Sequence, residues 1–174
     1  FRSRNSSAGR HSVSHLSIAQ ERQNSMKAPE QIDVGMLAAC GLNCMLCYRH
    51  LGKNPCPGCR ARVDEPDSYR RKCVMRACTM ERGYFSCADS VDRPCKRVKA
   101  FQKRYMGGYG VNLSTIAKAV LQDGAEAFLR ADLAAHTCPD CGHLINLHFG
   151  VCSGCGRQFP FGKGHTTKKE PSVP

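Results

Sequence analysis

The segment that decides the fold is residues 40–59, CGLNCMLCYRHLGKNPCPGC, which holds five cysteines. Cys44 and Cys47 form one C-x2-C pair, and Cys56 and Cys59 form another. Two cysteines at this spacing on a tight turn can direct both sulfurs at one metal ion. They suit a disulfide poorly, because the loop that such a bond closes is very short. The segment therefore predicts metal-bound thiolates.

The rest of the chain also favours metal binding over disulfides. Thirteen cysteines occur in 174 residues, and an odd number does not fit a fully paired disulfide framework. No apolar segment follows a basic start, and no apolar run is long enough to cross a membrane, so neither a secretory signal nor a transmembrane helix is predicted. We therefore expect a cytoplasmic protein whose thiolates bind metal in a reducing compartment.

Nine of the cysteines lie in a turn-rich region between residues 40 and 95. They are Cys40, Cys44, Cys47, Cys56, Cys59, Cys73, Cys78, Cys87 and Cys95. Nine equals two four-ligand sites plus one residue, but the spacing does not assign the partners. Two zinc sites, or one zinc site and one [4Fe–4S] cluster, both fit this count. The region buries little apolar surface, so bound metal is expected to stabilise it.

The C-x3-C-x2-C spacing of Cys40, Cys44 and Cys47 is also that of radical enzymes, whose cluster leaves one iron open for S-adenosylmethionine. Such enzymes need a large α/β barrel, and the sequence after Cys47 does not alternate strands and helices. A closed four-cysteine cluster is therefore the alternative to zinc. A ninth, unligated cysteine among arginines and lysines would be a reactive thiol. Only His50 is available as its base in this region, so we predict no catalytic residue.

The second metal motif is residues 138–156, CPDCGHLINLHFGVCSGCG, which contains two C-x2-C-G turns. Its predicted ligands are Cys138, Cys141, Cys152 and Cys155. The glycine after each pair permits a turn with positive φ that lets backbone amides face the sulfurs. Ile145, Leu147 and Phe149 alternate with polar or small residues, which predicts a short strand or hairpin. Four thiolates make a closed tetrahedral site, so we predict a structural zinc ribbon over 138–158.

A basic helix is predicted over residues 94–106. Val98, Phe101 and Tyr105 fall on one face, and a glycine-rich loop over 107–110 is expected to end the helix. The other faces carry Lys96, Arg97, Lys99, Lys103 and Arg104.

A helical hairpin is predicted after that loop. Asn112 is a plausible N-cap for a helix over 112–122, and Asp123-Gly124 predicts the turn into a second helix over Ala125–Ala135. The apolar stripe of the first helix is Leu113, Ile116, Ala117, Val120 and Leu121, and that of the second includes Phe128 and Leu129.

These elements predict a small metal-stabilised α-rich protein with a loop-rich cysteine cluster, a helical segment, a helical hairpin and a C-terminal zinc ribbon. The first 25 residues are rich in Ser, Arg and Gln, which is typical of disorder and, if amphipathic, of organellar transit peptides. The predicted organisation is a disordered N-terminal extension over 1–35, a cysteine-rich metal-binding domain with the hairpin over 36–137, the zinc ribbon over 138–158, and a disordered tail over 159–174.

The formal charge of +12 is concentrated in residues 40–104, which contain 15 basic and 6 acidic residues. Each zinc ion held by four thiolates is a unit of net charge −2, so three such sites would lower the total to about +6. The basic excess therefore has two explanations: it offsets thiolate charge, or it binds an acidic protein or a nucleic acid.

The order of the cysteines resembles a known family. AACGLNCMLCYRHLGKNPCPGCR, the C-x4-C of Cys73 and Cys78, Cys87, Pro94-Cys95, KRYMGGYGVNLSTIAKAVLQDGAEAFL and CPDCG…CSGCG together resemble the prokaryotic cysteine-rich family known as domain of unknown function 3795, over about residues 36–156. Members often have a further cysteine where this chain has Ser90, which leaves one family site in doubt.

The resemblance implies a small cytoplasmic metal-binding protein, with zinc or iron–sulfur centres and no established activity. We therefore expect a non-enzymatic, zinc-binding interaction module for an acidic protein or nucleic acid. The alternative is an iron–sulfur redox or metal-handling protein that uses the cysteines of 40–95.

Overall fold

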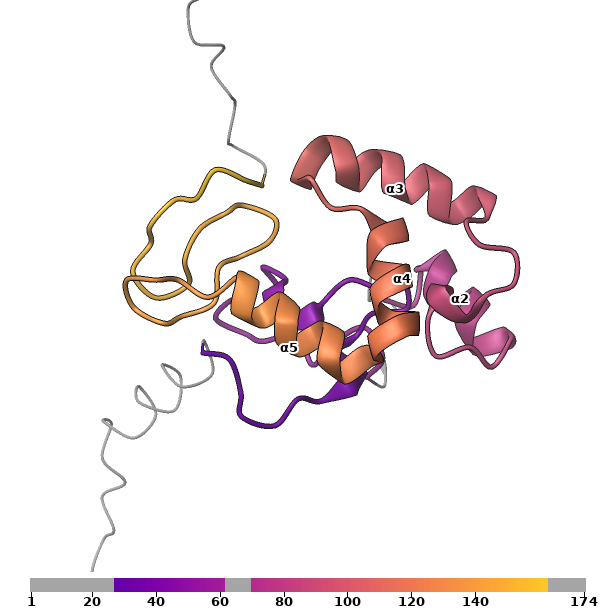
Figure 1. Cartoon of the computed structure of the whole chain (residues 1–174), viewed down its shortest axis with the longest axis horizontal. Helices are drawn as coiled ribbons and strands as arrows, with labels where there is room; N and C mark the ends of the chain where they lie inside the picture. The colour runs from indigo at the N-terminus through magenta and orange to yellow at the C-terminus, as the bar shows by residue number, and fades with distance from the viewer. Residues whose placement is uncertain (1–26, 62–69, 163–174) are drawn as a thin grey trace, which may run out of the picture.

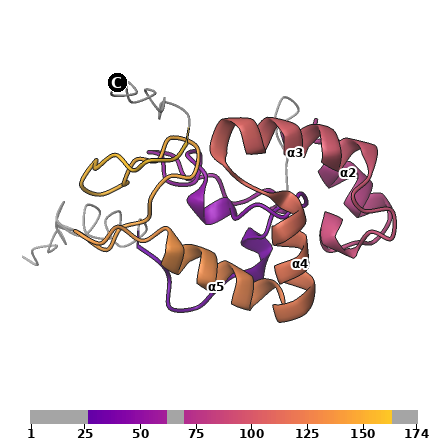
Figure 2. The ribbon, with the colours of Figure 1, turned by 45° about the horizontal axis from the view of Figure 1, so that its top comes forward.

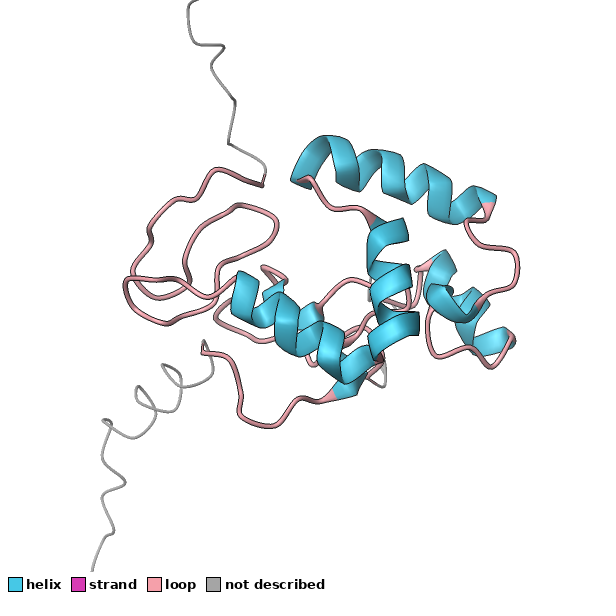
Figure 3. Ribbon diagram, viewed as in Figure 1, coloured by secondary structure: helices cyan, strands magenta, loops and turns pink. Residues whose placement is uncertain are grey.

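The computed structural model describes residues 27–61 and 70–162 (Figure 1). The predicted disorder of 1–26 and 163–174 falls outside these residues. The helices, in chain order, are η1 (Val34–Met36), η2 (Cys44–Leu46), α2 (Val74–Glu81), η3 (Cys87–Asp89), α3 (Lys96–Tyr109), α4 (Leu113–Asp123) and α5 (Ala125–Ala135). The described residues form no sheet, and their only β-pairing is a few isolated bridges (Figure 3). The α-rich class predicted from the sequence is therefore confirmed.

The helical hairpin of α4 and α5 is confirmed. The side chain of Asn112 accepts hydrogen bonds from the backbone N–H groups of Ser114 and Thr115, which is the predicted N-cap. Gly124 ends α4 and begins α5, and the two helices pack against each other (Figure 2). One stripe position was wrong: Leu121 is 48% exposed, because the buried side of α4 is centred on Leu113 and Val120.

Helix α3 is longer than the sequence predicted. It runs through Gly107 and Gly108, which were expected to form a loop, and ends at Tyr109. Glycines inside a helix cost about 1 kcal/mol each relative to alanine. Tyr109 compensates through ring contacts, tilted against Tyr105 with ring centroids 4.9 Å apart and edge-to-face with His148 at 5.0 Å. These contacts hold the last turn in helical form.

Helix α2 occupies a region that the sequence predicted to be loop. It has almost no apolar stripe, because only Met75 and Thr79 are buried, one turn apart. Val74 and Met80, its other large apolar residues, are 56% and 63% exposed. Hydrophobic periodicity is the main sequence signal for a helix, so its absence hid α2.

The main core joins the segment after η1 to the helical hairpin. The loops of 37–61 run through the middle of the molecule, beside α4 and α5 (Figures 1 and 2). The largest side chains with essentially no exposure are Leu37, Leu46, Leu129, Leu133 and Leu144. Each such leucine contributes about 1.5–3 kcal/mol through burial. The core therefore holds the cysteine-bearing loop in place from both sides.

The segment 138–158 is attached to this core and also has a small core of its own. Leu144 and Leu147 belong to the main core, and the N–H of Leu147 donates to the carbonyl of Leu46 at 3.0 Å. The small core is Cys138, Ile145 and Cys152, with Phe159 and Phe161 packed against it. In place of a regular strand, this segment has isolated bridges such as Ile145 with Cys152.

Two ends of the described chain differ from the predicted boundaries. Residues 27–35 were placed in the extension, but Lys27 pairs with His143 in an antiparallel bridge and Asp33 caps η1. Phe159 and Phe161 were placed in the tail and instead cover the small core. Both contacts depend on residues far along the chain, which local composition does not reveal. None of the helices in the described residues is long and apolar enough to cross a membrane.

Candidate metal centre

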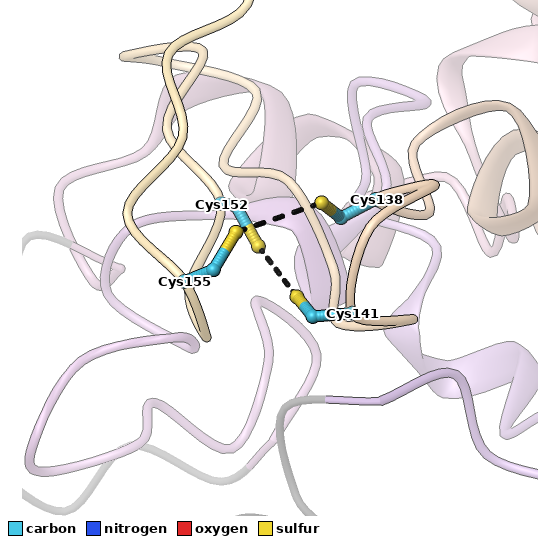
Figure 4. A group of neighbouring side chains, drawn as sticks. All are labelled: Cys138, Cys141, Cys152 and Cys155. Atoms are coloured by element: carbon cyan, nitrogen blue, oxygen red, sulfur yellow. Dashed lines mark hydrogen bonds between the residues drawn. The ribbon is translucent and has the colours of Figure 1, made fainter.

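Four cysteines from two separate turns come together at one point (Figure 4). They are Cys138, Cys141, Cys152 and Cys155, and their sulfur atoms all lie within 4.8 Å of one another. The sulfurs of Cys138 and Cys155 are 3.7 Å apart, and those of Cys141 and Cys152 are 3.4 Å apart. The sequence predicted this ligand set, and the structure brings its members together.

The two turns have the same backbone geometry. The N–H of Gly142 donates to the carbonyl of Cys138 at 2.9 Å, and the N–H of Gly156 donates to the carbonyl of Cys152 at 3.1 Å. Gly142 and Gly156 have φ of 72° and 75°, in the left-handed region that favours glycine. Each C-x2-C-G stretch is therefore folded so that its two sulfurs point to the same side.

The four thiols differ in burial. Cys138 and Cys152 are buried in the small core, Cys141 is half-buried and Cys155 is exposed. The backbone N–H of His143 is the main reason that the pKa of Cys141 is lowered to about 6, and a hydrogen bond from Cys152 adds to it. The inner pair is thus fixed by packing, while the outer pair is open to solvent and gives a metal ion a way in.

This arrangement can bind one metal ion with a complete ligand shell. Zn²⁺ is held by four thiolates in a tetrahedron, and iron takes the same geometry in S4 sites. The two nearby histidines have other contacts: the His143 side chain contacts both the carbonyl and the thiol of Cys141, and His148 Nε2 contacts the hydroxyl of Tyr105. Four sulfurs leave no position for a substrate or water, so the geometry fits a structural role.

The nine cysteines of 40–95 are arranged differently. All thirteen cysteines lie in described parts of the chain, and none forms a disulfide. Among the described residues, only the Cys138–Cys155 group has three or more potential ligand atoms that all lie within 4.8 Å of one another. The predicted ligands of 40–95 are therefore near one another without forming a compact four-sulfur group.

Three of the nine cysteines surround Cys59. The thiols of Cys44 and Cys59 share a hydrogen bond, which is the main reason that the pKa of Cys44 is raised and that of Cys59 is lowered to about 7. Burial raises the pKa of Cys40 to about 12, and the charge of Cys59 adds to it. Burial also raises the pKa of Cys47, again with a contribution from Cys59. We call Cys40, Cys44, Cys47 and Cys59 the first thiol set.

Three others surround Cys87. Burial raises the pKa of Cys87 to about 11, and the charges of Cys95, Cys78 and Cys73 add to it. These residues lie at or near element ends: Cys73 precedes α2, Cys87 begins η3 and Cys95 precedes α3. Cys73, Cys78, Cys87 and Cys95 form the second thiol set. Cys56 is the one cysteine of the nine that belongs to neither set.

Three arginines brace the first thiol set, and the sequence did not single them out. Arg60 Nε donates to the carbonyl of Leu37 at 2.9 Å, and Arg76 Nε donates to the carbonyl of Cys59 at 3.0 Å. Arg70 Nη1 donates to the carbonyl of Gly58 at 3.0 Å. All three arginines help to lower the pKa of Cys59. A sequence signal existed only for Arg60, which follows the C-x2-C pair directly.

The basic residues of α3 lie on its exposed side, as predicted. Val98, Phe101 and Tyr105 pack against the main core. The exposed basic residues are Lys96, Arg97, Lys99, Lys103 and Arg104. None of them forms an ion pair with an acidic residue in the described parts of the chain.

No family model, no curated protein and no solved structure matches this chain. Its functional assignment therefore rests on the residues of the sites themselves.

Proposed function

We propose that this chain is a metal-binding protein in which Cys138, Cys141, Cys152 and Cys155 hold a structural Zn²⁺. The observation that carries the proposal is the spacing of the four sulfurs. Tetrahedral zinc with Zn–S bonds of about 2.3 Å separates its sulfurs by about 3.8 Å. The two pairs at 3.7 and 3.4 Å need only small side-chain movements to reach that spacing. In this proposal residues 138–158 form a zinc ribbon.

The energetics of the segment support a structural metal. Its own core contains three buried residues, Cys138, Ile145 and Cys152, and two of them are ligands. Bound zinc contributes about 10–16 kcal/mol of apparent free energy in small zinc-dependent folds. That contribution greatly exceeds what one buried isoleucine supplies, about 1.5–3 kcal/mol. In this proposal the metal is therefore the main stabilising element of the small core.

Metal analysis of purified protein tests this proposal. Wild-type protein should contain zinc, and Cys152→Ser should contain one equivalent less. Ser153→Ala is the matched control, because it changes the adjacent residue and no ligand. Cobalt substituted into the wild-type site should show the ligand-to-metal absorption of a four-thiolate centre. Equal zinc content in Cys152→Ser and wild type would contradict the assignment.

We further propose that α3 is the docking face for an acidic partner, protein or nucleic acid. Its five exposed basic residues are unaccompanied by any acidic residue within the helix. The alternative was that they offset thiolate charge. The cations that act on Cys59 are Arg70, Arg76 and Arg60, none of which lies on α3. Because other arginines lie beside the thiols, the basic residues of α3 are better explained by binding of an acidic partner than by offsetting thiolate charge.

A binding titration at several salt concentrations tests the docking face. Labelled single-stranded and duplex oligonucleotides and an acidic peptide serve as probes. If α3 contacts about five phosphates of a duplex, log K should fall with log salt at a slope of about −4.5. Lys99→Glu with Lys103→Glu should abolish binding, while Lys118→Glu on α4 is the matched exposed control. Equal binding by both variants, or binding that ignores salt, would reject the docking face.

We also propose membership of the domain of unknown function 3795 family and a cytoplasmic location. The order of the cysteines supports the first, and thirteen thiols without a disulfide support the second. Where the family often has a further cysteine, Ser90 closes η3, and its hydroxyl accepts a hydrogen bond from the N–H of Asp92 at 3.3 Å. The second thiol set has four members without that position. We propose no catalytic residue.

A further inference from the structure

A cavity of about 370 Å³ lies beside the first thiol set. The 38–49 segment forms one wall, and α2, α3 and the Leu147–His148 turn supply the others. Its cysteines are Cys40, Cys44, Cys47, Cys59 and Cys73. The walls also include apolar side chains, among them Leu42, Met75 and Phe101. Five thiols therefore line one largely apolar pocket.

The spacing of these thiols does not fit a single metal ion. One zinc ion needs its four sulfurs about 3.8 Å apart. In contrast to the Cys138–Cys155 group, no three of these sulfurs lie within 4.8 Å of one another in the described structure. In a [4Fe–4S] cluster each thiolate binds a different iron, so the sulfurs stand around the outside of the cluster and face one another across its volume. Cys40, Cys44, Cys47 and Cys59 all line the cavity, and the hydrogen bond between the thiols of Cys44 and Cys59 must break for each sulfur to bind its own iron.

We propose that this cavity binds a [4Fe–4S] cluster through Cys40, Cys44, Cys47 and Cys59. The inference concerns a site separate from the proposed zinc ribbon and does not depend on it.

The choice of Cys59 over Cys73 as fourth ligand follows from proximity. The backbone N–H of Cys59 donates to the sulfur of Cys44 at 3.3 Å, and the charge of Cys59 also helps to raise the pKa of Cys40, Cys44 and Cys47. Cys73 also lines the cavity, but it contributes to the raised pKa of Cys87 in the second thiol set as well as to that of Cys40. With four cysteine ligands the cluster is closed, unlike the open cluster of radical enzymes.

The cavity wall supplies hydrogen-bond donors suited to a cluster. The N–H of Cys59 donates to the sulfur of Cys44 at 3.3 Å. Asn43 borders the cavity and is only 2% exposed, and its Nδ2 has no hydrogen-bond partner among the described residues. A buried donor without a partner is unfavourable, because it has lost its hydrogen bonds to water. Cluster sulfides and thiolates are acceptors, and hydrogen bonds to them tune such centres, so a bound cluster gives Asn43 its missing partner.

Positive charge is available for the anionic cluster. A [4Fe–4S]²⁺ core with four thiolates has a net charge of −2. Arg70 and Arg76 line the cavity. Both donate through hydrogen bonds to backbone carbonyls at Gly58 and Cys59, which fixes them beside the thiols. Fixed arginines offset the buried charge without themselves binding iron.

Anaerobic purification, followed by iron, sulfide and zinc analysis, tests the proposal on the wild-type chain. Where the cluster is lost on purification, ferric iron and sulfide are supplied with excess dithiothreitol, which reduces half of the iron. We expect about four irons and four sulfides per chain, a brown protein, and bleaching of its visible absorption by dithionite. A colourless protein that takes up no iron and sulfide under these conditions would overturn the proposal.

Variants identify the ligands. Cys44→Ser and Cys59→Ser should lose the cluster, whereas Cys56→Ser is the matched control and should retain it. Zinc content is read on the same samples, so a variant that keeps its zinc has kept its fold at 138–158. Retention of the full iron content by Cys59→Ser would overturn the ligand set, as would its loss in Cys56→Ser alone.

The Asn43 donor gives a second readout. Asn43→Ser keeps an oxygen for the backbone N–H of Met45, which the Asn43 side chain caps at 3.0 Å, but it removes the Nδ2 donor. Loss of an outer hydrogen bond typically weakens metal binding by about 10-fold or more. We expect the visible absorption to decay correspondingly faster in Asn43→Ser than in wild type. An unchanged decay would remove Asn43 from the site. If the wild-type protein contains iron and sulfide but no zinc, the zinc ribbon proposal is rejected and the cluster proposal is not affected.

Discussion

Replacing Gly142 with alanine should weaken metal binding at the Cys138–Cys155 group through the backbone alone. Gly142 has φ of 72°, and an added Cβ meets no atom within 4 Å. The variant therefore creates no clash, and its whole cost is the left-handed conformation of a residue with a Cβ. That conformation costs about 1–2 kcal/mol. In the proposed zinc site the metal-bound turn keeps this conformation, and we expect the metal-free turn of the variant to relax.

The expected magnitude follows from that cost. A penalty of about 1–2 kcal/mol corresponds to a roughly 5- to 30-fold weaker zinc affinity. Competition against a zinc chelator under reducing conditions measures it. Gly142→Asn should lose less affinity than Gly142→Ala, because asparagine tolerates the left-handed region. The same ordering is expected at Gly156, where φ is 75° and the space is also open.

Gly107 provides the matched control. It also has nothing within 4 Å of an added Cβ, but it lies inside α3. Gly107→Ala should therefore raise the free energy of unfolding by about 0.5–1 kcal/mol and leave zinc affinity unchanged. If Gly142→Ala binds zinc as tightly as wild type, the turn geometry does not control the site. If both alanine variants lower affinity equally, the effect is not specific to the turn.

Three further predictions concern the fold around the site. Leu129→Ala should lower the free energy of unfolding by about 2–5 kcal/mol in a denaturant titration, because its side chain is fully buried. Leu121→Ala should change it by less than about 0.5 kcal/mol, because its side chain is 48% exposed. Equal effects of the two variants would mean that α4 is rotated relative to the core. Tyr109→Ala should increase hydrogen exchange in the last turn of α3, where two glycines depend on its ring contacts; unchanged protection would assign the stability of that turn to another contact. Removing zinc with a chelator should abolish the NMR signals of the β-bridge between Ile145 and Cys152. The helical circular dichroism of α4 and α5 should remain. Loss of the helical signal together with the bridge would show that the α4–α5 hairpin depends on the metal.

Features that depend on residues close together in the chain were predictable from the sequence. The 3.6-residue period of apolar residues and the N-cap Asn112 predicted α4, and the turn at Asp123-Gly124 predicted the start of α5. The repeated C-x2-C-G pattern identified all four members of the Cys138–Cys155 group, because each turn fixes its own two sulfurs and two turns complete one shell.

Features that depend on distant contacts were not predictable. The grouping of the nine cysteines of 40–95 follows from how the chain returns to Cys59 and Cys87, and spacing does not encode that path. The extra turn of α3 depends on His148, more than 30 residues away along the chain. Asn43 carries no sequence signal beyond its position between two cysteines, since its significance lies in a buried donor without a partner.

The most direct test of the central claim is X-ray absorption at the zinc edge on protein purified under reducing conditions. The account predicts a zinc shell of four sulfurs at about 2.3 Å. It also predicts that this signal disappears in a variant carrying Cys138→Ser and Cys152→Ser. A wild-type zinc shell that contains nitrogen or oxygen ligands, or a protein without bound zinc, would contradict the assignment of Cys138, Cys141, Cys152 and Cys155 as a structural zinc site.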